Sequence, residues 1–251
     1  MKGKKIFLIV AGLVVALSVS AQNESFLGLC LGVASPQGVY ADKNFEVDEA
    51  GYANTGFLFS FDGAIFPDDY LGIGATVTYG SNNPDKTQYK SDLTQDFLER
   101  FPGISEEELE DRLYFDYGVW RYFNFHVGPA ITIPAGNFNF DINALAGLSV
   151  AWAPQQEFQV KLTEEETFSR KVENKASATL GYTVGGGIRY ALKRGYVIRV
   201  IASYTNCKPA MEISEIQPAV GEEEPEIVTR EVRMPIKNIH LGVGIAYNFE
   251  L

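Results

Sequence analysis

The chain has 251 residues, of which 46% are hydrophobic and 13% aromatic, and its formal net charge is −11 at pH 7. This acidic balance argues against a nucleic-acid partner, because phosphates are neutralised by Lys and Arg. The length suits one all-β domain or two smaller ones, and two cysteines are too few for a disulfide-dense scaffold.

The first 21 residues have the layout of a secretory signal peptide. The basic start MKGKK precedes the apolar run IFLIVAGLVVALSV, and small residues end at an expected cut between Ala21 and Gln22. A membrane-anchor helix is the alternative, but the run is shorter than the roughly 20 residues that a helical span needs. We therefore predict an exported chain, with residues 1–21 removed and residues 22–251 forming the mature domain.

Eight stretches of the mature chain alternate large apolar residues with small or polar ones. A period of two indicates β-strands with two different environments. The alternation has exceptions. Leu145 and Ile201 are large residues at positions where small or polar ones are expected, and Pro129 interrupts the fourth stretch. In chain order the expected strands cover residues 27–34, 57–65, 71–80, 123–133, 138–152, 179–190, 196–205 and 239–251.

The connections between these strands alternate between long and short. The short ones, FPDDY, PAGN and KRG, join the second strand to the third, the fourth to the fifth and the sixth to the seventh. In the long segment after Ser81, SDLTQDFLERF repeats apolar residues every four positions, and Ser105 and Glu108 have the spacing of a capping box. We expect short helices there, and we interpret Gly185–Gly187, which lies within a strand, as a close-packing site or a kink.

The residue types on the small-and-polar face of the strands, the small-and-polar parity, indicate which face is inside the barrel. This parity consists mainly of Gly, Ala, Ser, Thr and Asn, whereas a soluble barrel would show many charged residues to water. Aromatic residues also fall near the strand ends, as in the two girdles of a membrane barrel: Phe66, Tyr70, Phe138, Tyr196 and Phe249 by the short turns, and Tyr79, Trp152 and Tyr204 by the long connections.

We therefore predict an all-β fold, an eight-stranded antiparallel up-and-down transmembrane β-barrel with short periplasmic turns and long outer loops. The alternative is a soluble exported barrel that binds an apolar ligand inside. Cys30 and Cys207 fall on the first and seventh strands, which the eighth strand separates in a sheet that closes in order. We expect both to be free thiols.

With this layout, the mature chain resembles the small outer-membrane β-barrel proteins of Gram-negative bacteria, OmpA-like or OmpX-like, and the porin-family barrels of the Bacteroidetes. The resemblance covers nearly all of residues 22–251 and rests on pattern rather than on a catalytic motif. It implies insertion into outer-membrane lipid. It also implies recognition of the last strand, with Tyr247, Phe249 and Leu251, by the barrel-assembly machinery. Glu250 and Leu251 follow the last Phe, which departs from the usual terminal aromatic.

An interior polar cluster is expected on the inward parity. Charges in a narrow lumen need partners, and neighbouring strands permit a pairing of Asp141 with Arg189, so we interpret the cluster as a structural plug. The sequence offers no Ser-plus-acid arrangement beside either His and little for a metal site. We therefore name no catalytic, cofactor-binding or metal-binding residue. The cluster comprises Asp62, His126, Asp141, Arg189, Arg199 and His240.

The predicted function is non-enzymatic, without a cofactor. It is a structural or surface-interaction role in which long acidic loops, including SEEELED and GEEEPE, meet an unknown extracellular partner. A narrow pore for ions or small solutes is the alternative.

Overall fold

The computed structural model describes residues 25–47, 49–161, 167–172, 175–217 and 226–250. The expected signal peptide, its cut between Ala21 and Gln22, Leu251 and nearly all of GEEEPE lie outside the described residues.

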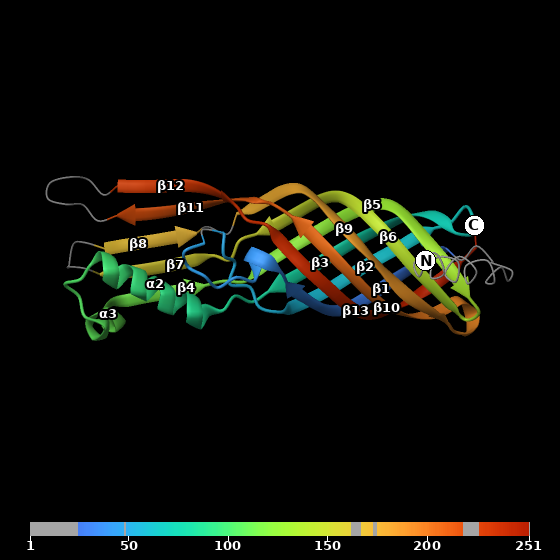
Figure 1. The fold of residues 1–251 in the computed structure, drawn as a ribbon, viewed down its shortest axis with the longest axis horizontal. Coiled ribbons are helices and arrows are strands. Elements are labelled where there is room, and N and C mark those ends of the chain that lie inside the picture. The colour runs from blue at the N-terminus through green and yellow to red at the C-terminus, as the bar shows by residue number, and fades with distance from the viewer. Residues whose placement is uncertain (1–24, 48, 162–166, 173–174, 218–225, 251) are drawn as a thin grey trace, which may run out of the picture.

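Eight long strands form a closed antiparallel barrel (Figure 1). Their order around the barrel is β1-β13-β10-β9-β6-β5-β3-β2, and β1 pairs with both β2 and β13, which closes the sheet. The eight predicted strands are thus confirmed. Their bounds are β1 (Ser25–Pro36), β2 (Gly56–Ile65), β3 (Leu71–Asn82), β5 (Trp120–Ala135), β6 (Phe138–Trp152), β9 (Ala176–Ala191), β10 (Tyr196–Cys207) and β13 (Ile236–Phe249).

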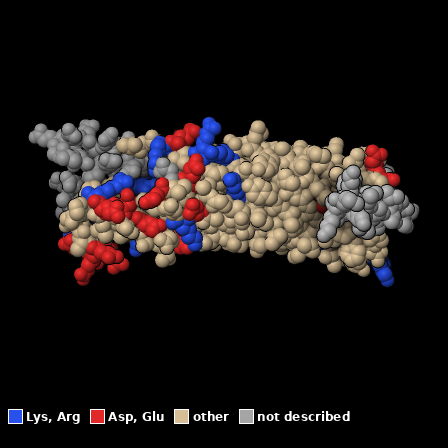
Figure 2. Space-filling model, viewed as in Figure 1, with Lys and Arg blue, Asp and Glu red and all other residues tan. Residues whose placement is uncertain are grey.

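The large residues of the barrel strands point outward, as the alternation predicts. On β13, Val243 and Ile245 are each 63% exposed, whereas their neighbours toward the lumen are small. Leu145 and Ile201, the large residues on the other parity, are buried inside. Figure 2 shows that charged side chains on the visible face gather at the ends of the molecule and leave an uncharged band over the barrel, where the exposed large residues are apolar. Such a band suits lipid rather than water.

A second, five-stranded sheet projects from one end of the barrel (Figure 1). Its order, β12-β11-β8-β7-β4, follows the barrel order β13-β10-β9-β6-β5, because each of its strands continues one of these barrel strands after a short break. Pro154, Pro209 and Pro235 lie in three of the breaks, where a proline cannot donate to the ladder. The bounds are β4 (Leu113–Tyr117), β7 (Gln156–Lys161), β8 (Thr167–Val172), β11 (Ala210–Gln217) and β12 (Glu226–Arg233).

This sheet corrects the expectation that the long connections are loops with short helices. The helices themselves are confirmed: α2 (Lys86–Arg100) and α3 (Glu106–Arg112), the latter with the predicted capping box of Ser105 and Glu108. Single 3₁₀ turns occur at η1 (Gly38–Tyr40) and η2 (Lys193–Gly195). We call β4, β7, β8, β11, β12, α2 and α3 together the outer platform. No helix among the described residues is both long and apolar enough to cross a membrane.

The outer platform has a hydrophobic core of its own. Helix α2 buries Tyr89, Leu93 and Phe97, which pack with residues of the sheet such as Phe158 and Phe168. The Phe97 ring lies 5.4 Å from the Phe168 ring and 6.1 Å from the Phe158 ring, distances typical of favourable aromatic pairs. The platform is therefore a folded layer and not a set of independent loops.

Candidate functional site

Two ion pairs lie inside the barrel toward the short turns. Arg189 of β9 donates from Nε and Nη2 to the two carboxylate oxygens of Asp141 on β6, at 2.8 and 3.0 Å. Nη1 of Arg199 on β10 lies 2.8 and 2.7 Å from the two carboxylate oxygens of Asp62 on β2. The structure therefore forms the Asp141–Arg189 pair that the neighbouring strands permit and adds a second pair, Asp62–Arg199, across the lumen.

The two arginines stand opposite each other in the β9–β10 register, which would place like charges side by side. Both guanidinium groups lie over the Phe26 ring, with their central carbons 4.2 and 4.3 Å from its centroid. A cation over an aromatic face is stabilised by the ring quadrupole. Each arginine thus has its own carboxylate and shares one ring, which accounts for two adjacent buried cations.

A chain of hydrogen bonds fills the next level of the lumen. His126 contacts Ser149 Oγ through Nε2 at 3.1 Å and Thr183 Oγ1 through Nδ1 at 2.9 Å. Thr183 in turn contacts Thr205 at 2.9 Å, which lies 3.5 Å from His240 Nδ1. These contacts connect five barrel strands, β5, β6, β9, β10 and β13, through polar side chains.

His240 ends this chain by bonding the hydroxyl of Tyr122 through Nε2 at 2.8 Å. Ser149 is a neighbour of His126 that sequence reasoning missed. In the part of the chain that the structure describes, no carboxylate is hydrogen-bonded to either histidine. The arrangement therefore has a His–Ser contact without the acid that orients and charges a catalytic histidine.

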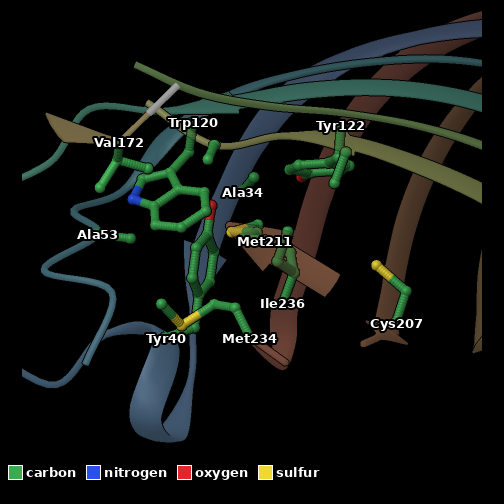
Figure 3. Close-up of a cluster of buried hydrophobic side chains, with 12 residues drawn as sticks. Ala34, Tyr40, Ala53, Trp120, Tyr122, Val172, Cys207, Met211, Met234 and Ile236 are labelled. Carbon is green, nitrogen blue, oxygen red and sulfur yellow. The ribbon is translucent and has the colours of Figure 1, made fainter. Parts of the chain in front are cut away.

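Apolar residues close both ends of this polar interior. At the platform end, Trp120 and Tyr40 meet edge to face with ring centroids 5.4 Å apart, among the buried residues of β1, β5, β6, β10 and β13 (Figure 3). At the short-turn end, Phe26 and Phe66 form a second cluster with small side chains. Between the clusters lies a cavity of about 40 Å³, a volume with room for a few water molecules.

Phe66 corrects one expectation of the sequence. It was assigned to the aromatic girdle, but it is only 1% exposed and packs inside the barrel, 6.4 Å from the Phe26 ring. Its backbone N–H donates to Ser25 Oγ at 3.1 Å, which turns the chain inward just after β2 ends. Other predicted girdle residues, Tyr70, Phe138, Tyr196 and Tyr79, are exposed as expected.

The two cysteines and the residues of the last strand were also predicted from the sequence. Cys30 and Cys207 are buried free thiols, as expected. Tyr247 is exposed on the lipid-facing parity of β13, and Phe249 ends that strand. Within the described ranges, no group of three or more His, Cys, Asp or Glu side chains is placed to hold a metal ion.

Polar contacts hold the platform helices to the rest of the chain. Asp85 caps α2 by accepting from Gln88 N–H, and its carboxylate lies 2.7 Å from Lys43 Nζ. The hydrogen bond from Lys43, followed by the one from Gln88, lowers the pKa of Asp85. Tyr52 donates to Asp92 at 2.6 Å, and burial and this bond raise the Tyr52 pKa.

No protein-family description matches the chain, and no curated protein matches it. Solved structures do. Ail of Yersinia pestis is 14% identical over 90% of this chain and 99% of its own, with a TM-score of 0.41. OprG of Pseudomonas aeruginosa is 9% identical over 92% and 98%, with a TM-score of 0.46. A major outer membrane protein of Thermus thermophilus is 9% identical over 90% and 99%, with a TM-score of 0.44.

Because these TM-scores are below 0.5, the assignment of the fold rests on the strand order and the exposed belt described above. A closed antiparallel sheet of even strand number, an apolar outer surface, and short connections at one end with long ones at the other define the outer-membrane type of barrel. The chain is a small outer-membrane-type β-barrel that carries a folded platform at one end.

Proposed function

We propose that the chain is an integral outer-membrane protein that displays the outer platform at the cell surface, with the barrel as its anchor. The observation that carries this proposal is the continuity of the platform strands with five barrel strands. Because the platform strands continue the barrel strands, the platform has a fixed orientation. Less conformational entropy is then lost when it binds a partner.

The acidic residues of the platform favour a partner with a basic face. Helix α3 carries Glu106, Glu107, Glu108, Glu110 and Asp111 against a single Arg112. Ail has been crystallised with the heparin analogue sucrose octasulfate. For this chain, the charge of α3 argues against a polyanion of that kind, because like charges at an interface are repulsive.

The filled interior of the barrel favours an anchor role over a pore. Aromatic clusters cover both ends of the polar core, and eight strands enclose a space that side chains fill. The barrel is therefore expected to give no steady conductance in planar lipid bilayers. Stable single-channel steps from the purified protein would favour the pore instead.

Surface display is tested by labelling substituted cysteines with a membrane-impermeant maleimide on intact cells. Thr229→Cys lies on exposed β12 of the platform, and Lys193→Cys lies in the short turn at the opposite end. The proposal predicts labelling of the first variant in intact cells and of the second only after the membrane is broken. The unsubstituted protein is the background control, because both native thiols are buried. Equal labelling of the two variants in intact cells would refute the proposed orientation.

A further inference from the structure

The lipid-facing wall of the barrel contains a groove that the anchor role does not explain. Its volume is about 590 Å³, and it runs over β1, β13, β10 and β9. Its floor forms where Ala202 of β10 stands opposite Gly186 of β9, two small residues in a belt of large ones. Its walls are the apolar side chains Leu31, Val33, Ile188, Val200, Leu241 and Val243.

Two lysines lie at the platform end of the same strands. Lys237 is on the outward parity of β13, four positions before Leu241 in the groove wall, and Lys208 follows the last residue of β10. The six residues from Lys237 to Val243 in the groove wall span about 20 Å of strand, or roughly 15 Å along the membrane normal at a tilt of about 40°. This is comparable with the roughly 15 Å half-thickness of a bilayer core, so the lysines fall at headgroup level when the groove lies within the hydrocarbon.

Neither ammonium group is held by a close carboxylate of the residues that the structure describes. Among the described residues, Lys237 has no carboxylate within salt-bridge distance, and Lys208 reaches Glu49 only at 4.0 Å with both side chains largely exposed. Such an exposed pair contributes little. The same level carries polar groups of the membrane interface: Asn206, opposite Lys237 in the register, donates to the Tyr182 hydroxyl at 3.2 Å.

We propose that the groove and its two lysines bind one anionic lipid of the leaflet on the platform side. The lipid phosphate lies against Lys237 and Lys208, and one acyl chain lies over Ala202 and Gly186. Charge complementarity selects an anionic headgroup over a zwitterionic one, because each Lys near a membrane surface adds attraction for anionic lipid. The inference rests on the proposed membrane insertion of the barrel.

The test uses the full mature protein, delipidated in non-ionic detergent. Bound lipid is counted by native mass spectrometry after titration with dioleoylphosphatidylglycerol or dioleoylphosphatidylcholine. We expect tighter binding of the phosphatidylglycerol, by about tenfold to thirtyfold for two lysines. The double variant Lys208→Gln with Lys237→Gln should remove this preference. Lys193→Gln, at the opposite end of the barrel, loses the same kind of charge and should keep it.

The groove is tested separately by filling it. Ala202→Phe points outward into the groove and should weaken binding of both lipids, whereas Ala146→Phe, on the outward face of β6 away from the groove, should not. Gly186 is left unchanged, because a Cβ there would meet the Asp141 backbone oxygen.

Heat-modifiable migration on a gel confirms that each variant is a folded barrel. A folded barrel that binds both lipids equally, or whose preference survives the double lysine variant, overturns the lipid site and leaves the anchor role intact. Displacement of phosphatidylglycerol by inorganic phosphate in the millimolar range would also overturn it, because the lysines would then bind a free anion without the groove. Loss of heat-modifiability in the unsubstituted protein would instead refute the membrane barrel itself.

Discussion

Arg189 donates hydrogen bonds from all three of its guanidinium nitrogens inside the barrel. It is 0% exposed and bonds Asn248 at 2.9 Å and Thr132 at 3.0 Å in addition to Asp141. These partners come from β13, β5 and β6, so a single guanidinium joins four strands of the closed sheet. Removing one partner of a buried pair is costly mainly because the other charge is left without compensation.

Asp141→Ala should therefore destabilise the barrel by about 3–5 kcal/mol, measured by urea unfolding of protein refolded into lipid vesicles. Asp116→Ala, an exposed carboxylate on β4, is the matched control and should change the unfolding free energy by less than about 0.5 kcal/mol. Adding Arg189→Met to Asp141→Ala should recover part of the loss, because the uncompensated cation is then gone. Equal unfolding free energies for the Asp141 variant and the control would contradict the interior ion pair.

Phe66 gives a second test at the scale of one residue, because the sequence pattern and the structure disagree about it. Inside the barrel, Phe66→Ala should cost about 3–5 kcal/mol through the cavity that it leaves. Phe138→Ala, on the lipid-facing side at the same end and 44% exposed, leaves no cavity inside the barrel and should cost clearly less. The comparison uses the same urea unfolding measurement. The reverse order of the two losses would place Phe66 back in the girdle.

At the scale of single elements, α2 depends on its cap. The folded pKa of Asp85 is lowered, chiefly by Lys43, so its ionised form is favoured in the folded state. The resulting stability is fully present above the unfolded pKa of about 3.9 and is lost as the pH falls through the lower folded pKa. Deuterium exchange of α2 amides should therefore show less protection as the pH drops below about 4.

The matched variant for this prediction is Asp85→Asn, which keeps an N-cap side chain but removes the charge. Above pH 4, the α2 amides of this variant should be less protected from deuterium exchange than those of the unsubstituted protein. Below pH 4, the two proteins should show the same protection. A constant difference across the pH range would show that the Asp85 carboxylate does not titrate as described.

The platform has its own core around Phe97 in addition to the cluster in which Val172 and Met211 pack with barrel residues, so this core should be open to mutation without loss of the barrel. Phe97→Ala removes the ring that contacts Phe101, Phe158 and Phe168, and should open the platform to limited proteolysis. The barrel should remain heat-modifiable on a gel. Leu98→Ala, a partly buried neighbour on α2, is the milder control. Simultaneous loss of barrel and platform would show that they fold as one unit.

At the scale of the whole molecule, the barrel could be predicted from sequence because lipid imposes the same rule on every outward residue of eight long strands. The platform was missed because its strands have only five to eight residues and are separated from the barrel strands by short breaks, four of which contain Pro or Gly and resemble loops. Phe158 with Val160, and Phe168 with Val172, carry a short alternating signal that could have revealed it.

The sequence alternation predicts which residues point into the barrel, but it does not predict which of them contact each other. Inward positions identified Arg189 and Asp141, whose strands are neighbours. The Arg199–Asp62 pair crosses the lumen between strands that are not adjacent, and Ser149 meets His126 diagonally across the β5–β6 register. Such contacts depend on the curvature and closure of the sheet, which sequence spacing does not encode.

The central claim is that the large residues of eight strands face lipid around a closed barrel. The most direct measurement is a heat-modifiability gel on the outer-membrane fraction of cells that express the chain. Our account predicts that the protein is found in that fraction and migrates differently before and after boiling in SDS. Recovery from the soluble periplasm, with the same migration in both conditions, would mean that the barrel is not a membrane protein.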